Sequence, residues 1–415
     1  MRVLVVGSGG REHALVWKLA QSPLLTKLYA VPGNPGMAEH AELLAGGTDP
    51  DSLVALATLY GIDLVVIGPE QPLVAGAVDR LTDAGIMAFG PHAAAAQLEG
   101  SKRFSKEFMT RHGVPAAESA SFDDETAALS HLRGLHKPPV VKKSGLAAGK
   151  GVTVTDSFQE AEAAVRMVFA DAGSGGVVLE ERLQGRELSL LGITDGSNWL
   201  PLLMAQDYKY HLEGDAGPMT GGMGAVAPAG LLSRQQLEQV NDRIVERTLS
   251  GLRKDGLRFS GILFIGLMLT SDGVKVLEYN VRLGDPETQS VLPLLMSDLL
   301  EVILAACQGR LGRQELQWSG QAAAGVVMTA PGYPGTPERD IPLVPAAQAP
   351  GLLVFHAGTR LQDGQLLSSG GRVLNVVGVG TSLTEALGRA YAGVAETTFK
   401  GAYWRRDIGL NLTEA

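Results

Sequence analysis

The sequence has little cysteine, no long apolar run and no excess of positive charge. Its 415 residues include a single cysteine, Cys307, so no disulfide can form within the chain, as is typical of proteins from a reducing compartment. No apolar run approaches the length that spans a bilayer, and we expect no signal peptide ahead of the first strand. Because 44 Asp and Glu outnumber 35 Lys and Arg, a nucleic-acid-binding surface is not expected. These absences predict a cytoplasmic protein without nucleic-acid or membrane partners.

Glycine, in contrast, is abundant. The chain has 53 glycines, well above the usual share of about 7%. Such an excess is typical of tight turns and of loops in which the backbone approaches a ligand closely. Hydrophobic residues make up 45% and charged residues 19%, the balance of a globular protein, and the length predicts about two to four domains.

The N-terminal part alternates short apolar runs with helical patterns, which predicts a doubly wound parallel sheet. In such a sheet ligands bind beyond the carboxyl ends of the strands, where this sequence has glycine-containing loops. The strands are predicted at residues 3–6, 28–31, 64–67 and 86–89, and the helices at residues 12–21, 51–60 and 72–84.

The first of these loops, Gly7-Ser-Gly-Gly-Arg-Glu-His13, resembles a dinucleotide fingerprint but does not match it. The fingerprint requires glycine where this chain has Glu12, and the second strand ends in Val31-Pro-Gly without an acidic residue for the ribose. The loop precedes a helix whose free amides can bind a phosphate. We therefore expect a small phosphorylated ligand in preference to NAD.

Residues 97–113 are predicted to form one amphipathic linking helix, and a second α/β unit follows. In this unit the loop over residues 144–151 joins two strands. Three residues rather than four separate its first glycine from Gly149-Lys150, so it is not a Walker A sequence. The pattern predicts a hairpin whose backbone amides cover phosphates. Lys142 would supply positive charge there, while Lys143 faces the other way.

The stretch from Val276 to Gln289 is predicted to be a strand that ends in a charged loop. A carboxylate and an amide oxygen two residues apart suit Mg²⁺, and an arginine beside them is placed to hold a carboxylate or a phosphate. An ordinary charged strand edge is the alternative. Since alternate residues of a strand share a face, the side chains expected to point the same way are Val276, Glu278, Asn280 and Arg282.

Two regions complete the pattern. Residues 214–224 contain too many glycines for a helix or a strand, and a loop of this length is predicted to be functional. From residue 321 onward the chain predicts a small, separate α+β domain, in which His356 is expected to be a packed residue at a strand end.

In this order the motifs resemble the ATP-grasp superfamily and, within it, the phosphoribosylamine–glycine ligase family. The likeness covers essentially the whole chain, and the blocks at residues 145–152 and 282–287 are its most specific parts. The motifs are Gly9-Gly-Arg-Glu-His-Ala14, Pro32-Gly-Asn34, Gly68-Pro-Glu70, Gln97-Leu-Glu-Gly-Ser-Lys102, Gly145-Leu-Ala-Ala-Gly-Lys-Gly-Val152, Thr220-Gly-Gly-Met-Gly224, Arg282-Leu-Gly-Asp-Pro-Glu287 and Phe355-His-Ala-Gly-Thr359.

The resemblance implies an α/β fold with an N-terminal doubly wound parallel sheet, an ATP-grasp (α+β) core with a small lid subdomain, and a small C-terminal α+β domain. The expected boundaries are residues 1–101, 102–316 with the lid at about 115–187, and 317–415. It also implies an ATP- and Mg²⁺- or Mn²⁺-dependent ligase of purine biosynthesis. Such an enzyme joins glycine to 5-phosphoribosylamine through glycyl phosphate, and we expect it to be a monomer or a weak homodimer.

Carried over residue by residue, the resemblance assigns roles within the site. Arg282 is expected to hold the glycine carboxylate, Asp207 its ammonium group, and Lys142 the ATP phosphates; these three form the expected catalytic set. The ATP-binding residues are Lys102, Lys142, Gly149, Glu180, Leu183 and Glu187; the substrate-binding residues are Gly9, Gly10, Arg11, Glu12, Glu70, Asp207, Arg282 and Asp285; and the metal ligands are Glu278 and Asn280.

The chain departs from the family pattern at Lys143, Ser144, Tyr208 and Val281, and Ser144 leaves open how the phosphate loop is tethered. Three alternative functions remain at this point. They are another ATP-grasp carboxylate-amine ligase or carboxylase acting on a phosphoribosyl substrate, a nucleotide-binding sensor without turnover, and a dehydrogenase built on the N-terminal sheet.

Overall fold

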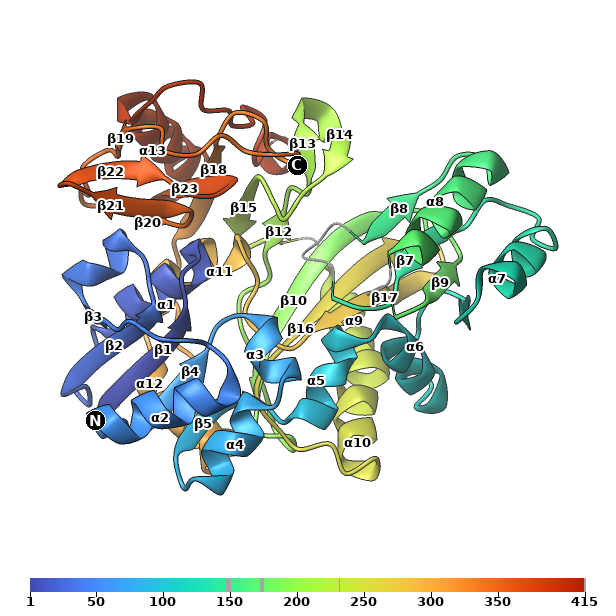
Figure 1. Cartoon of the computed structure of the whole chain (residues 1–415), viewed down its shortest axis with the longest axis horizontal. Helices are drawn as coiled ribbons and strands as arrows, with labels where there is room; N and C mark the ends of the chain where they lie inside the picture. The colour runs from blue at the N-terminus through green and yellow to red at the C-terminus, as the bar shows by residue number, and fades with distance from the viewer. Residues whose placement is uncertain (147–150, 172–174, 231, 414–415) are drawn as a thin grey trace.

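The computed structural model describes residues 1–146, 151–171, 175–230 and 232–413. In Figure 1 the N-terminal part and the C-terminal part stack on one side of the molecule, and a smaller lid projects from the other side. No helix in these ranges is long and apolar enough to cross a membrane.

The N-terminal part is the predicted parallel sheet, with strand order β5-β4-β1-β2-β3. Both faces of β1 are buried: Val3 and Val5 belong to one apolar cluster, and Leu4 and Val6 belong to another. This alternation explains why the strand reads as a continuous apolar run. The elements are β1 (Arg2–Gly7), α1 (Gly10–Leu19), β2 (Lys27–Pro32), η1 (Pro35–Glu39), β3 (Glu42–Leu43), α2 (Pro50–Tyr60), β4 (Leu64–Ile67), α3 (Glu70–Val74), α4 (Ala77–Asp83), β5 (Met87–Pro91) and α5 (Ala93–Gly100).

Two helices that the sequence predicts as single are each broken in the structure. The helix expected at residues 72–84 divides into α3 and α4 around Gly76, whose φ of 86° is left-handed and suits glycine. The helix expected at residues 97–113 divides into α5 and α6 (Lys102–Arg111) at Ser101. Ser101 has extended backbone, and its hydroxyl accepts the amide of Phe104 as the N-cap of α6.

The lid is a four-stranded antiparallel sheet of order β6-β9-β7-β8 covered by two helices. It has an apolar core of its own, in which Ala161 and Val165 of the second helix pack on Val141 and Leu179. The elements are β6 (Ser119–Phe122), α7 (Glu125–Leu132), β7 (Val140–Lys143), β8 (Val152–Val154), α8 (Phe158–Ala170) and β9 (Val177–Glu180).

The central sheet continues the N-terminal sheet. The first residues of the long strand β16 pair with the end of β5, Phe259 with Pro91, and the nine strands form one sheet. The N-terminal and central sheets are therefore continuous, which the strand patterns do not reveal. The central elements are β10 (Arg186–Thr194), β11 (Trp199–Pro201), α9 (Arg234–Val240), the π-helix η3 (Asn241–Val245), α10 (Glu246–Lys254), β16 (Phe259–Thr270) and β17 (Gly273–Asn280).

Strand β17 contains a bulge that changes which of its residues share a face. Leu267 pairs with Val276 but the adjacent Gly266 pairs with Glu278, so Leu277 is an extra residue. Val276 and Tyr279 consequently both lie in the apolar core, while Glu278 and Asn280 face the cleft described below. The prediction that Val276 points the same way as Glu278 was wrong for this reason.

The C-terminal sheet includes strands from the middle of the chain, in the order β12-β15-β18-β23-β20. Strand β14 lies within the glycine-rich stretch 214–224, where no strand was expected, and β15 begins at the last residue of that stretch. The elements are β12 (Gln206–Asp207), β13 (Tyr210–Leu212), η2 (Glu213–Asp215), β14 (Ala216–Met219), β15 (Gly224–Ala227), β18 (Ala322–Thr329), β19 (Leu343–Val344), β20 (Leu352–His356), β21 (Thr359–Gln362), β22 (Gln365–Ser368), β23 (Arg372–Gly380), α13 (Leu383–Glu396), β24 (Thr398–Phe399) and α14 (Leu410–Thr413).

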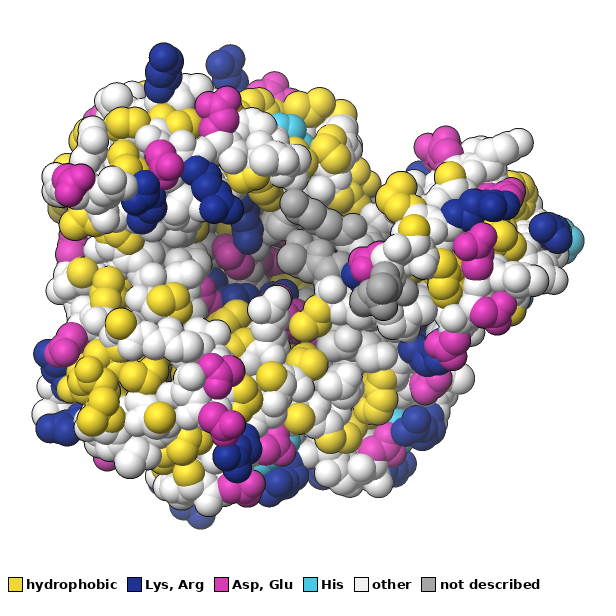
Figure 2. All heavy atoms as spheres, viewed as in Figure 1, with side chains coloured by type: hydrophobic (Ala, Val, Ile, Leu, Met, Phe, Trp, Pro, Cys, Tyr) yellow, Lys and Arg dark blue, Asp and Glu magenta, His cyan; other side chains and the backbone are white. Residues whose placement is uncertain are grey.

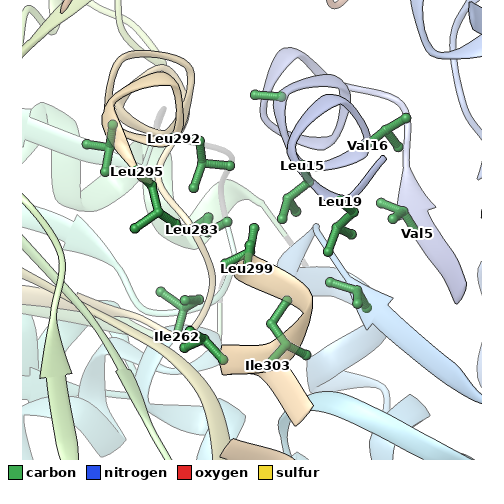
Figure 3. Close-up of a cluster of buried hydrophobic side chains, with 14 of the residues drawn as sticks. Val5, Leu15, Val16, Leu19, Ile262, Leu283, Leu292, Leu295, Leu299 and Ile303 are labelled. Atoms are coloured by element: carbon green, nitrogen blue, oxygen red, sulfur yellow. The ribbon is translucent and has the colours of Figure 1, made fainter. Parts of the chain in front are cut away.

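Apolar packing joins the N-terminal part to the segment that follows β17. Figure 3 shows Leu15 and Leu19 of α1 pointing toward Leu283, Leu292 and Leu299, and all of these side chains are buried. This packing fixes the N-terminal loop beside the charged end of β17. The segment consists of α11 (Glu287–Val291), η4 (Leu292–Leu294), α12 (Leu299–Cys307) and η5 (Leu311–Arg313).

Candidate functional site

A cleft of about 870 Å³ lies where the three parts of the chain meet. Figure 2 shows a hollow at the centre of one face, with basic and acidic side chains inside it. Its lining includes parts of the lid, β12, β17, α11 and the N-terminal loops. The predicted site residues that line it are Arg11, Glu70, Lys102, Lys142, Glu180, Leu183, Glu187, Asp207, Glu278, Asn280, Arg282 and Asp285.

Of the other predicted site residues, three lie outside the lining and one is not described. Gly149 falls outside the described residues, and Gly9, Gly10 and Glu12 are not part of the lining. Glu12 is buried, and its carboxylate accepts the amide of Gly9 at 2.7 Å and pairs with the guanidinium of Arg11. Glu12 therefore closes the loop ahead of α1 and leaves Arg11 at the cleft.

Lysines gather at the lid side of the cleft. Nζ of Lys142 on β7 and Nζ of Lys106 on α6 each lie 2.9 Å from the same carboxylate oxygen of Glu180. Lys102, one turn before Lys106 on α6, is also at the cleft, and burial lowers its pKa against the opposing effect of Glu278. Lys143, in contrast, pairs with Asp171 away from the cleft, as the alternation of β7 predicts.

Glu278 and Asn280 present two oxygen ligands at the floor of the cleft. Burial opposes the charge of Glu278, but Lys209, Lys142 and Lys102 together lower its pKa, so the carboxylate is ionised at neutral pH. The side-chain oxygen of Asn280 accepts Nη2 of Arg282 at 3.1 Å and keeps a second lone pair. A carboxylate and an amide oxygen form a donor set that fits a hard divalent cation.

Arg282 is held by two acidic side chains from the N-terminal part. Its Nη2 lies 2.9 Å from Oε1 of Glu99, and its Nε lies 3.5 Å from Oε2 of Glu70. The second oxygen of Glu99 accepts the amide of Val281 at 2.7 Å. Burial opposes the charge of Arg282, yet Glu99 and Glu70 raise its pKa further above the usual range. An incoming carboxylate therefore has to share this guanidinium with Glu70 or displace it.

A second acidic group lies between β10, β12 and α11. The hydroxyl of Ser189 lies 3.2 Å from Oε1 of Glu287 and 3.5 Å from Oδ1 of Asp207. Burial, reinforced by Asp207, raises the pKa of Glu287 to about 7. Lys209 balances part of this charge, with Nζ 2.9 Å from Glu187 and 3.8 Å from Asp207. Ammonium groups suit such a cluster of acceptors.

Two of the four departures from the family pattern, Ser144 and Tyr208, have direct structural explanations. The carbonyl of Ser144 accepts the amide of Lys102 at 2.9 Å, and its hydroxyl accepts the amide of Arg103 at 3.3 Å, so the start of α6 tethers the phosphate loop. Tyr208 is buried, and the guanidinium of Arg405 lies 5.2 Å from its ring centre.

Several charged residues at the cleft were not predicted from the sequence. Lys106 could have been found, since it lies four residues after Lys102 on a predicted helix and shares its face. Glu99, Lys209 and Glu287 lie only two or three residues from predicted site residues, so their neighbourhood was a signal that could have found them. Arg372 reaches the cleft from β23, and no spacing in the sequence indicates that it lies there. These residues are Glu99, Lys106, Lys209, Glu287 and Arg372.

A lid that carries lysines, facing a strand that carries a carboxylate and an amide oxygen, defines a protein of the ATP-grasp class. Models of phosphoribosylglycinamide synthetase match the chain with its N domain at residues 1–99, its ATP-grasp (A) domain at residues 100–288 and its C domain at residues 323–411. The chain belongs to this family.

Individual relatives agree over the full length. The phosphoribosylamine–glycine ligase of Rhizobium meliloti (strain 1021) is 48% identical over 415 residues, which cover 99% of this chain and 98% of the relative. The crystal structure of the Thermotoga maritima phosphoribosylamine–glycine ligase superposes with a TM-score of 0.87 at 34% identity, covering 98% of this chain and 100% of that one. A biotin carboxylase domain from Hydrogenobacter thermophilus shares the fold, with a TM-score of 0.74 at 17% identity and coverage of 97% and 91%.

Proposed function

We propose that this chain is an ATP-dependent ligase that joins glycine to 5-phosphoribosylamine, giving glycinamide ribonucleotide, ADP and phosphate for purine biosynthesis. The observation that carries the proposal is that one cleft brings together the lysines of α6 and β7, the oxygen pair on β17 and the acidic group beside Ser189. Full-length similarity to enzymes of that name supports it.

The lid side of the cleft suits the phosphates of ATP. Lys102 and Lys142 supply positive charge to the phosphates. Along the cleft we place the adenine against the backbone groups of Glu180 and Leu183, so the side chain of Glu180 is not one of its ligands, and the ribose beside Glu187. Phosphoryl transfer depends mainly on positioning and on neutralising charge. A divalent cation held by Glu278 and Asn280 would neutralise phosphate charge, and we propose Mg²⁺ or Mn²⁺ for this site.

The opposite side suits a small amino acid. We assign the glycine carboxylate to Arg282, where it would replace Glu70 as a partner, and the glycine ammonium to Asp207. ATP phosphorylates the carboxylate, and the amine of phosphoribosylamine then attacks the acyl carbon. A C–N bond forms, the C–O bond to phosphate breaks, and phosphate leaves with the electron pair.

We place phosphoribosylamine beside Arg11, Glu70 and Asp285, with the loop of Gly9, Gly10 and Glu12 shaping this end. We also propose that the enzyme works in the cytoplasm as a monomer or a weak homodimer. The lone Cys307 fits a reducing compartment, because no disulfide can form within the chain.

The test is ADP release from Mg-ATP with glycine and with phosphoribosylamine formed in situ from ribose 5-phosphate and ammonia. We expect release only when glycine and phosphoribosylamine are both present, and loss of release when alanine replaces glycine. Release that depends on bicarbonate instead of glycine would assign the chain to the carboxylases. ATP binding without release under any combination would indicate a nucleotide sensor.

A further inference from the structure

Lys106 is a buried cation at the nucleotide side of the cleft. Only 6% of the residue is exposed, and it lies one helical turn after Lys102, so both lysines reach the cleft from one face of α6. Its Nζ atom lies 2.9 Å from Oε2 of Glu180, the same oxygen that lies 2.9 Å from Nζ of Lys142. Two ammonium groups therefore share one buried carboxylate.

The two pairings connect different parts of the fold. Lys142 and Glu180 lie on β7 and β9, which are neighbouring strands of the lid sheet, so this pair moves with the lid. Lys106 lies on α6, which precedes the lid in the chain. Its pairing with Glu180 thus links the lid to the remainder of the cleft.

The second lysine matters because a buried carboxylate without a cation is strongly destabilising. If Lys142 were the single partner of Glu180, binding of the Lys142 ammonium group to a phosphate would leave the buried carboxylate of Glu180 without a cation. With Lys106 present, Glu180 keeps a partner. Lys106 in turn depends on Glu180. Burial lowers the pKa of Lys106, Glu180 opposes this effect by raising the pKa, and the nearby charge of Lys142 lowers it.

We propose that Lys106 is a positioning residue for ATP, which neutralises Glu180 so that Lys142 is free to bind the phosphates. The proposal rests on the proposed function only for the identity of ATP as phosphoryl donor. It differs from the reading in which Lys106 itself contacts the nucleotide, and the two readings predict opposite results when Glu180 is changed together with Lys106.

The experiment measures the Kd of Mg-ATP for the full-length protein by titration calorimetry, without glycine or phosphoribosylamine. For Lys106→Met we expect Kd to rise at least about tenfold, because Lys142 stays with Glu180. In Lys106→Met with Glu180→Gln the carboxylate is gone, and we expect Kd to return to within about threefold of the original protein. We expect the Lys142→Met/Glu180→Gln protein to bind Mg-ATP weakly, since the lysine that binds the phosphates is missing.

Two single variants complete the design. Lys106→Arg keeps the charge and should bind nearly as the original protein does, which tests the proposal even if Lys106→Met does not fold. Lys143→Met is the matched control, because Lys143 lies on the same strand as Lys142 but pairs with Asp171 away from the cleft. An unchanged Kd for Lys106→Met, or a Lys106→Met/Glu180→Gln protein as weak as Lys106→Met, would overturn the proposal. Both outcomes are read without the ligase reaction, so failure of that reaction is a separate result.

Discussion

Asp207 and Glu287 place two carboxylates next to each other in a buried site, with the hydroxyl of Ser189 between them. Such a pair favours retention of a proton by one member, because two adjacent buried charges repel each other. The folded protein therefore carries an unfavourable ionisation at neutral pH when no substrate is bound. A site with two adjacent carboxylates binds an ammonium group more tightly, but it lowers the free energy of unfolding of the ligand-free protein.

This loss of stability predicts that Glu287→Gln changes the free energy of unfolding in a pH-dependent way. In the folded protein the pKa of Glu287 is about 7, against an ordinary value of 4.5, so between these values the folded state retains a proton that the unfolded state has released. The stability that Glu287 contributes therefore falls as pH rises through this window. We expect Glu287→Gln to be more stable than the original at pH 8, by up to about 3 kcal/mol, and similar to it near pH 5.

Urea unfolding of the ligand-free protein at several pH values measures this difference. Glu301→Gln, at an exposed position on α12, is the control, and its difference from the original should not change with pH. A Glu287→Gln protein whose relative stability is the same at pH 5 and pH 8 would show that Glu287 is not protonated in the folded state.

Glu278→Gln tests the metal ligands. Replacing the carboxylate by an amide removes the charged ligand, and it also leaves Lys209, Lys142 and Lys102 without an anion between them. At limiting Mg²⁺ we expect turnover to fall at least about tenfold, with partial recovery as Mg²⁺ is raised. Equal turnover of both proteins at limiting Mg²⁺ would move the metal site elsewhere; Glu238→Gln on the exposed face of α9 is the control.

At the scale of elements, the boundary between α5 and α6 gives a prediction whose sign is diagnostic. Were residues 97–113 one helix, Ser101→Ala would replace a poor helix former by a good one and stabilise the protein. In the structure Ser101 caps α6 through the amide of Phe104. We therefore expect Ser101→Ala to destabilise the protein by about 1 kcal/mol.

The measurement is the free energy of unfolding in urea, with Ser101→Asp as the comparison, because aspartate is an equally good N-cap. Ser101→Asp should keep the stability of the original protein, whereas a gain from Ser101→Ala would restore the single-helix prediction. Because α6 carries Lys102 and Lys106, its first turn also sets where these two ammonium groups enter the cleft.

The elements also indicate how far sequence reasoning reaches here. Strands buried on both faces, such as β1 and β4, have continuous apolar runs and were predicted correctly. The bulge at Leu277 and the break at Ser101 depend on which neighbours the residues meet in space, which local periodicity does not contain. The same holds for the site: the motifs indicate Glu278, Asn280 and Arg282, but Glu99 becomes a partner of Arg282 only through the packing of α5 beside β17.

At the scale of the whole molecule, Arg372 connects the C-terminal sheet to the cleft. From β23 its guanidinium donates to the carboxylate of Asp285 at 2.9 Å, to the carbonyl of Asp285 at 2.8 Å and to the carbonyl of Gly221. Strand pairing crosses the proposed domain boundaries near residues 101 and 316, and an ion pair crosses the second. We therefore propose these boundaries as divisions of the sequence and not as divisions between separate sheets.

We expect Arg372→Leu to lower the free energy of unfolding by about 1.5 to 3 kcal/mol, since Asp285 loses its charged partner in a partly buried place. Arg360→Leu is the matched control: this arginine lies on β21 and pairs with Asp340 at the surface, where the loss should be below about 1 kcal/mol. Urea unfolding measures both. Equal losses for the two variants would mean that Arg372 is an ordinary surface arginine.

The shared C-terminal sheet has a consequence for the order in which the protein can mature on the ribosome. Strand β15 needs β18 as its neighbour, and β18 leaves the ribosome only after the whole central sheet has been made. The lid, whose sheet and apolar core lie within residues 119–180, can fold during synthesis. The glycine-rich stretch 214–224, which lines the cleft at Thr220 and Gly221, cannot take its final place this early, because its partner Arg372 is translated later still. A nascent chain can therefore have a folded lid with its lysines well before it has a complete substrate site.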